Sequence, residues 1–485
     1  MTMEPRGRVV IVGGGITGLA AALYLRQHAP DLALTLLETD TRLGGKISTT
    51  RANGFVIEGG PDSFLSYKAR GLGLCRELGL ESRLQGTSGK VRRTYILRDN
   101  RLYQLPEGLT GLIPSRFGPM TRTPLISPWG KLRMGLEYFI PPRMTPEDES
   151  LGAFVSRRLG REVYERLIEP LMSGIYAGDG NQLSLNATFP NLRKAEVEHG
   201  GLIKSMLNAK GTPPQDAPSS TAKKWPAFLT LQNGLGELVD AIVTKLNSDV
   251  DIRLATRVTG ITRGEHSGYG LEIENEKPMQ ADAVILTTPA FATAEIMEPI
   301  DAQVADALRN IPYASSATVS VVYPLAQAQV RMALDAHGYI IPRREGHPVL
   351  ACTWTSTKFP HRAPEGFALI RAFLGRAGQD DIVERSDEEL VQLVRDELKT
   401  VMGITATPQM QFVFRWRQAM PQYTLGHLDR VKLIEHRINK HPGLFCAGAA
   451  FRGIGIPDCI ASGERAAAQT LGHLKTQPHM GVIPA

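Results

Sequence analysis

The chain has 485 residues, a length that predicts about two to four domains. Hydrophobic residues make up 42% and charged residues 21%, which is ordinary globular usage and excludes wholesale disorder. The formal net charge of +6 includes no block of lysine and arginine, so the composition argues against nucleic-acid binding.

Cysteine content favours a reducing compartment. The four cysteines are too few for disulfide bonds to stabilise a chain of this length, so we expect a cytoplasmic location. No C-x-x-C or zinc spacing is present, so we expect no metal site. Val9–Leu25 is an uncharged stretch but contains three successive glycines, so a strand, turn and helix explain it better than a membrane segment. Any membrane contact is therefore expected to be at most peripheral.

The first residues predict a β-α-β unit. Val9–Val12 is an apolar run of buried-strand length, and Leu19–Tyr24 begin a helix after a glycine turn. Leu34–Leu37 form a second strand, which Glu38 closes. This order is typical of the start of a dinucleotide-binding domain.

The middle of the chain changes character twice. Prolines divide residues 106 to about 231 into short segments, with helices predicted at Glu147–Leu159 and Arg161–Met172. Buried-type strands return at Ala283–Leu286, and further strands and a helix near Glu388–Thr400 follow. The chain ends with a strand at Leu444–Cys446, a glycine-rich turn and a helix from about 460 to 471.

Glycine spacing after the first strand predicts a dinucleotide site. In Gly13-x-Gly15-x-x-Gly18, the first glycine permits a tight turn, the second lets backbone approach a pyrophosphate, and the third allows close packing of helix on strand. Glu38 lies 20 residues after Gly18, where a carboxylate accepts hydrogen bonds from ribose. An acid at this place argues against a 2′-phosphate and leaves FAD or NAD.

A second motif favours FAD. Arg42-Leu-Gly-Gly-Lys46 resembles the second fingerprint of the FAD-dependent amine oxidase superfamily. Near the other end, the turn between Cys446 and Cys459 again joins a strand to a helix and offers N–H groups to an anion or a flavin. Glycine turns at both ends of one nucleotide domain suit one long cofactor.

Several motifs narrow the resemblance to the porphyrinogen oxidases of heme synthesis. They are Glu58–Phe64, Gly174–Asp179, Leu183–Pro190 and the turn Gly453–Cys459. The forms Gly60–Ser63 and Ser173–Asp179 are most similar to those of the soluble bacterial coproporphyrinogen III oxidases. The Gly174–Asp179 segment is the most specific of these, because it lies outside the cofactor domain.

The resemblance implies an α/β fold with a discontinuous, Rossmann-like FAD-binding domain. We assign residues 1–65, 229–290 and 413–475 to that domain. An α+β substrate-binding domain then comprises 66–105 and 291–412, and a mainly helical insert comprises 106–228.

The resemblance also implies the site residues. The predicted FAD contacts are Gly13, Gly14, Gly15, Ile16, Thr17, Gly18, Glu38, Arg42, Gly45, Lys46, Gly60, Pro61, Asp62, Ser63, Val258, Trp416, Ala449, Ile454, Gly455 and Ile456. The predicted substrate contacts are Lys68, Gly174, Ile175 and Tyr176. Taken alone, Val258, Trp416 and Tyr176 also suit core positions, and Lys68 also suits a solvated surface. No catalytic acid or base is assigned.

The expected reaction is the six-electron oxidation of coproporphyrinogen III to coproporphyrin III, with O2 as acceptor and release of H2O2. The expected partners are a tetrapyrrole and O2, and docking of another heme-pathway enzyme is left open. Protoporphyrinogen IX is the alternative substrate. An amine oxidase or carotenoid desaturase relative, and a non-catalytic flavin-binding protein, are the remaining hypotheses.

Overall fold

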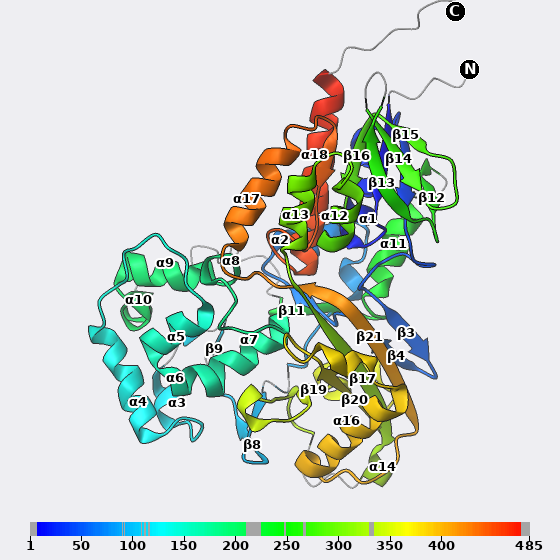
Figure 1. Cartoon of the computed structure of the whole chain (residues 1–485). Helices are drawn as coiled ribbons and strands as arrows, with labels where there is room; N and C mark the ends of the chain where they lie inside the picture. Colours follow the sequence, from blue (N-terminus) through cyan, green and yellow to red (C-terminus); the bar gives the residue numbers. More distant parts are fainter. Residues whose placement is uncertain are drawn as a thin grey trace, which may run out of the picture.

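The computed structural model describes residues 7–89, 91, 93–107, 109–110, 113–114, 117–209, 225–246, 249–264, 268–328 and 334–476. Figure 1 shows a nucleotide-domain sheet with its covering helices at the top, a helical region on one side and a larger sheet below. Among the described residues, no helix is long and apolar enough to cross a membrane.

A five-stranded parallel sheet forms the centre of the nucleotide domain, in the order β12-β2-β1-β16-β22. Its strands are β1 (Arg8–Val12), β2 (Ala33–Leu37), β12 (Asp251–Arg253), β16 (Ala283–Leu286) and β22 (Leu444–Cys446). The order reverses at β1, whose two neighbours are β2 and β16. Ligands of open α/β sheets bind at such a switch point, beyond the carboxyl ends of the strands.

Alternate residues of β1 face two different hydrophobic cores, as the period of two in a strand requires. Val9 and Ile11 pack with α1 (Ile16–His28), α11 (Gly236–Leu246) and α18 (Ile456–Thr476). Val10 and Val12 pack with the other face, which comprises β13 (Val258–Arg263), β14 (Tyr269–Ile273), β15 (Met279–Ala281), α12 (Ala290–Met297), α13 (Ala302–Arg309) and α17 (His427–Ile438). The predicted Rossmann-like layering is confirmed.

A seven-stranded sheet forms the second region, in the order β21-β17-β20-β19-β18-β7-β8. Its strands are β7 (Tyr95–Arg98), β8 (Arg101–Gln104), β17 (Tyr313–Pro324), β18 (Gly338–Ile340), β19 (Val349–Trp354), β20 (Phe367–Leu374) and β21 (Met410–Pro421). Helix α16 (Asp387–Met402) packs on this sheet and begins with a capping box of Ser386 and Glu389. The proposed domain boundary between residues 412 and 413 falls inside β21, and the division into domains stays a prediction.

The segment from residue 117 to residue 209 is mainly helical. Its helices are α3 (Phe117–Arg122), α4 (Pro128–Gly135), η2 (Leu136–Phe139), α5 (Leu151–Leu159), α6 (Arg161–Val163), η3 (Tyr164–Ile168), α7 (Glu169–Tyr176), α8 (Leu185–Thr188), α9 (Pro190–His199) and α10 (Leu202–Ala209). The run from α6 to α7 is continuous, with η3 as a π-helical turn. It ends where Ala177 adopts a left-handed conformation, φ +48°.

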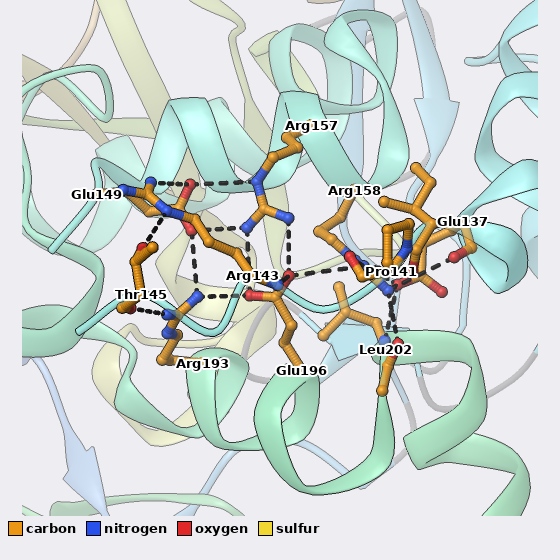
Figure 2. Close-up of polar contacts among 12 residues, drawn as sticks. Glu137, Pro141, Arg143, Thr145, Glu149, Arg157, Arg158, Arg193, Glu196 and Leu202 are labelled. Atoms are coloured by element: carbon orange, nitrogen blue, oxygen red, sulfur yellow. Dashed lines mark hydrogen bonds and ion pairs between the residues drawn. The ribbon is translucent and has the colours of Figure 1, made fainter. Parts of the chain in front are cut away.

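Ion pairs hold the helical segment together (Figure 2). Arg158 and Glu137 are both fully buried, and Glu137 also accepts hydrogen bonds from the backbone nitrogens of Leu202 and Ile203. Arg157 bridges Glu149 and Glu196, at 2.7 Å to each. The network therefore fastens the stretch from 137 to 149 onto α5, α9 and α10.

Smaller elements complete the fold. They are β3 (Thr49–Ala52), β4 (Phe55–Glu58), β5 (Phe64–Leu65), β6 (Leu84–Gly86), β9 (Leu109–Thr110), β10 (Ile113–Pro114), β11 (Phe228–Leu231), α2 (Ala69–Glu77), η1 (Glu81–Arg83), α14 (Leu325–Ala328), η5 (Arg343–Glu345), α15 (Thr355–Lys358), η6 (Pro360–Arg362) and η7 (Asp380–Glu384). Strand β11 pairs with both β5 and β6 and so connects segments about 140 residues or more apart.

Candidate active site

The turn between β1 and α1 has the geometry that its glycines predict. Gly13 has φ +107°, and a β-carbon at Gly18 would overlap the Gly13 carbonyl oxygen. A β-carbon at Gly15 would meet no atom within 4 Å, so this glycine faces open space. No side chain caps α1 and its first turn carries no acid. Its first N–H groups can therefore bind an anion.

Glu38 lies at the carboxyl end of β2, beside this turn. One carboxylate oxygen accepts a hydrogen bond from the Gly14 nitrogen at 2.6 Å, and the other accepts from the Asp40 nitrogen at 2.8 Å. Each oxygen keeps a second lone pair. Glu38 can therefore also accept hydrogen bonds from the two hydroxyl groups of a ribose.

The Arg42–Lys46 loop lies against the glycine turn. The Gly44 nitrogen donates to the Gly14 oxygen at 2.9 Å, and a β-carbon at Gly45 would lie 3.2 Å from the Gly15 α-carbon. The Arg42 guanidinium donates to carbonyl oxygens of its own loop, at Leu43, Gly45 and Ile47. Arg42 thus stabilises the conformation of its own loop, and its contact with FAD stays a prediction.

Lys46 ends this loop. Its side chain is accessible to solvent, yet desolvation by the surrounding protein lowers the pKa of its ammonium group. The lysine is therefore well placed to meet an anionic or polar group of a large ligand.

Three donors from the seven-stranded sheet hold the turn at Gly59 and Gly60. The Gly59 oxygen accepts hydrogen bonds from Trp416, Thr318 and Arg371, each at 2.9 Å, and Arg371 also donates to the Gly60 oxygen at 2.5 Å. Trp416 thus lies directly beside the predicted flavin-binding turn. Its role as a flavin contact stays a prediction.

Asp62 is an ionised carboxylate in this turn. Burial acts to raise its pKa, but Lys358 at 2.8 Å and Arg371 outweigh that effect and hold the pKa well below its usual range. Ser63 donates to the other oxygen of Asp62 at 2.6 Å. The side chains of Asp62 and Ser63 therefore hold each other in place.

The C-terminal turn lies next to the start of α1. A β-carbon at Gly463 in α18 would overlap the Thr17 carbonyl oxygen, and one at Gly448 would lie 3.8 Å from the Thr17 hydroxyl oxygen. The predicted contacts Ala449, Ile454, Gly455 and Ile456 all belong to this turn or to the first residue of α18. Three glycine-rich segments, far apart in the sequence, therefore meet at one place.

Val258 begins β13, close to the ribose acid. The Thr256 nitrogen, two residues earlier, donates to the Glu38 carbonyl oxygen at 2.8 Å. Val258 is itself buried, at 6% exposure, among hydrophobic residues on the second face of the sheet. The structure shows the core position that Val258 also suits, and its contact with FAD stays a prediction.

The predicted substrate residues differ in their surroundings. Gly174 and Ile175 are exposed at the end of α7, whereas Tyr176 is buried. Lys68 forms an ion pair with Asp458 at 2.5 Å, so it is not simply a solvated surface lysine. Burial, together with Asp458, raises the pKa of Tyr176 to about 12. Lys68 and Tyr176 thus flank the same carboxylate at the start of α18.

Residues that the sequence did not single out also shape the site. Arg371 is the clearest, because it is 3% exposed and holds two predicted flavin-turn carbonyls. The sequence could have identified Arg371, because it is the only charged residue in the apolar strand Phe367–Leu374. Thr318, Lys358 and Tyr423 left no comparable signal, because their partners are distant in sequence.

These elements define a class of protein. A helix N-terminus, a ribose-type acid and further glycine turns lie together here, and groups of these kinds bind the successive parts of an FAD molecule. Glu38 suits the ribose, α1 the pyrophosphate, and the Gly60 and C-terminal turns the flavin. The fold and site define an FAD-binding oxidoreductase.

Comparison with known proteins agrees with this assignment. The model of the flavin-containing amine oxidoreductases matches residues 16–471. The chain is 41% identical to the coproporphyrinogen III oxidase of Bacillus subtilis, over 97% of this chain and 99% of that protein. It is 30% identical to the protoporphyrinogen oxidase of Homo sapiens, over 97% and 99% of the two chains. The solved structure of a putative protoporphyrinogen oxidase from Exiguobacterium sp. 255-15 superposes with a TM-score of 0.84, at 34% identity, over 95% and 98% of the two chains.

The chain belongs to the flavin-containing amine oxidoreductase family, and it is an FAD-dependent enzyme. Its resemblance to the porphyrinogen oxidases, first drawn from short motifs, is confirmed along nearly the whole sequence. Of the two cofactors that the first glycine motif left open, the family supports FAD.

Proposed function

We propose that this protein oxidises coproporphyrinogen III to coproporphyrin III. Six hydrogens leave the tetrapyrrole in three two-electron steps, and three O2 molecules become three H2O2. When bound, the flavin accepts the electrons of each step and passes them to O2. The observation that carries the choice of substrate is the identity of 41% to a coproporphyrinogen III oxidase, against 30% to a protoporphyrinogen oxidase of equal coverage.

The end of α7 is the proposed wall for the tetrapyrrole. The last carbonyl groups of a helix have no partner within it. Here the Ser173 oxygen accepts from the Ala177 nitrogen and the Tyr176 oxygen from Gln422, both at 2.8 Å. Among the described residues, no hydrogen bond reaches the carbonyl oxygens of Gly174 and Ile175. Both residues are exposed, so we propose that these two carbonyls accept hydrogen bonds from pyrrole N–H groups.

Lys68 is the proposed contact for a propionate. Its ammonium group already meets Asp458, but it has three donors and is partly exposed. A propionate can therefore bind it without replacing the aspartate. Because coproporphyrinogen has four propionates and protoporphyrinogen only two, cationic groups around the pocket favour the former.

The proposed partners are the tetrapyrrole and O2. We keep the cytoplasm as the proposed compartment because all four cysteines are free thiols. Any membrane contact is proposed to be peripheral, through the insert, where α4 and η2 expose Trp129, Leu132, Leu136 and Phe139. Sedimentation with phosphatidylglycerol vesicles measures that contact, and recovery from cells only in detergent would contradict it.

Anaerobic mixing with each porphyrinogen tests the proposed function. Coproporphyrinogen III should bleach the flavin absorbance. Readmitted air should restore the absorbance, with one H2O2 formed for each electron pair that the flavin passes to O2. We expect kcat/KM for coproporphyrinogen III to exceed that for protoporphyrinogen IX by about tenfold, which corresponds to about 1.4 kcal/mol. The opposite order would make the protein a protoporphyrinogen oxidase.

A pair of variants localises the substrate. Ile175→Glu introduces a charge at the proposed tetrapyrrole wall and should abolish porphyrinogen oxidation while FAD stays bound. Val197→Glu is the matched control, because Val197 is similarly exposed in the same insert, at 43% against 46%. Flavin that neither porphyrinogen bleaches in the wild type would instead point to the amine oxidase or carotenoid desaturase hypothesis.

A further inference from the structure

Tyr423 joins both ends of the C-terminal glycine-rich turn. This residue lies between β21 and α17 and is 1% exposed. Its hydroxyl donates to the Ala449 carbonyl oxygen at 2.6 Å and accepts from the Gly453 nitrogen at 2.7 Å. Burial raises the pKa of Tyr423 far above its usual value, so the hydroxyl keeps the proton that it donates.

His427 holds the middle of the same turn. Its ring stacks on Tyr423, with centroids 4.0 Å apart and planes inclined by 15°. Its Nε2 lies 2.8 Å from the Phe451 carbonyl oxygen. Burial lowers the pKa of His427 to about 4, so the ring is neutral near pH 7 and its Nε2 carries the hydrogen of this bond. Two stacked rings thus fix the turn at residues 449, 451 and 453.

The other side of this segment holds the proposed tetrapyrrole wall. Gln422 donates to the Tyr176 carbonyl oxygen at 2.8 Å. The Ser184 nitrogen donates to the Tyr423 carbonyl oxygen, also at 2.8 Å, and the Tyr176 and Tyr423 rings lie 6.2 Å apart. One short stretch of chain therefore touches the flavin-facing turn and the end of α7 at once.

We propose that Tyr423 is a positioning residue that sets the flavin-facing turn relative to the end of α7. The side chain acts through Ala449 and Gly453 and is not assigned a contact with substrate. The inference about the flavin depends on the family's cofactor, and the inference about the substrate also rests on the proposed function. Hydride transfer depends steeply on the alignment of the two reactants, so a small displacement of the turn should slow it.

Tyr423→Phe tests this role by removing the hydroxyl and keeping the ring. The partly buried Ala449 oxygen and Gly453 nitrogen then lose their partner, and the turn must relax to satisfy them. We expect the Kd for FAD to rise about tenfold and the visible flavin absorbance to shift. The kcat for coproporphyrinogen III should fall about tenfold, with KM changing less.

Tyr269→Phe is the matched control. Tyr269 is also 1% exposed, and its hydroxyl donates to the Pro442 carbonyl oxygen at 2.8 Å on the other face of the nucleotide sheet. Both variants should lower the Tm, but only Tyr423→Phe should change the FAD Kd and the flavin spectrum. Equal FAD Kd values and identical spectra for the two variants would overturn the proposal.

A second variant guards against a folding defect. His427→Phe keeps the stacked ring and removes the donor to the Phe451 oxygen, so it should weaken FAD binding by a smaller factor. If Tyr423→Phe is insoluble while Tyr269→Phe and His427→Phe are soluble, Tyr423 is required for folding. That result would overturn the proposal that Tyr423 only positions the turn. The FAD measurements use no porphyrinogen, so a wild type that binds FAD but oxidises neither porphyrinogen would contradict only the proposed function.

Discussion

The carbonyl oxygen of Lys46 lies directly against the α-carbon of Gly60, so that a β-carbon at Gly60 would overlap it. This contact brings together the second and third predicted flavin-binding segments, which are separated by β3 and β4. Only a glycine permits backbone atoms to approach so closely.

Gly60→Ala should therefore push these two segments apart. We expect a loss of stability of about 1–3 kcal/mol, as for overpacking in a core, and incomplete FAD occupancy. Thermal unfolding and the ratio of flavin to protein absorbance measure the two effects. Gly472→Ala is the control, because Gly472 is exposed in α18 with no atom within 4 Å of the added carbon. Full flavin occupancy in Gly60→Ala would argue against this turn as part of the cofactor site.

Variants at Gly15 should change cofactor binding without changing the stability of the fold. Because its β-carbon would meet no atom within 4 Å, Gly15→Glu should leave the Tm of the flavin-free protein nearly unchanged. The introduced carboxylate would face the pyrophosphate, and binding of FAD should be lost. Titration of the flavin-free protein with FAD measures this effect, and Gly15→Ala should weaken binding less. A Gly15→Glu protein that retains FAD would contradict the assignment of this turn.

The Arg158–Glu137 pair should be the costliest ion pair of the insert to break. Arg158→Met leaves the fully buried Glu137 without its cation, and we expect a loss of about 3–5 kcal/mol in the free energy of unfolding. Arg161→Met is the control, because its side chain is 85% exposed and pairs with Glu165 at the surface. Urea unfolding measures both. If both variants lose the same free energy of unfolding, burial does not determine the cost of breaking an ion pair.

The Lys68–Asp458 pair offers a test of the substrate contact. Lys68→Ala should narrow the preference for coproporphyrinogen III, because it removes a cation and leaves Asp458 unpaired. Asp458→Asn should instead release the lysine and lower the KM for coproporphyrinogen III. If Lys68 serves only as the partner of Asp458, both variants will impair the enzyme alike. Steady-state kinetics with the two porphyrinogens distinguish these outcomes.

Buried neutral histidines predict acid sensitivity. Burial lowers the pKa of His427 and that of His361 to about 4, below the usual value of about 6.5. As the pH falls, these histidines take up protons in the unfolded chain at a higher pH than in the folded protein. The free energy of unfolding is therefore highest above pH 6.5 and decreases as the pH falls toward 4. His427→Gln should reduce this loss by about 2 kcal/mol at pH 5. His436→Gln, on the exposed face of α17, is the control in unfolding experiments at pH 7 and pH 5.

Local rules account for what could be predicted from the sequence. Strand, turn and helix around Gly13–Gly18 follow from apolar runs and glycine spacing, and the structure reproduces them. The predicted helix Glu147–Leu159 was wrong at its start, since α5 begins at Leu151 with Ser150 as its cap. Glu149 instead pairs with Arg157, a tertiary contact that opposes the local helical preference.

The sequence by itself determined the cofactor, because FAD binding depends on short segments whose glycines have local roles. Only the tertiary structure decided which side chains hold those segments in place. Arg371 lies 312 residues from Gly59, and Tyr423 lies 30 residues from Gly453, with α17 and β22 between them. No spacing rule connects such pairs. Hydrogen bonds between them exist only once the sheets and helices have packed, because packing alone brings the donor and the acceptor within reach.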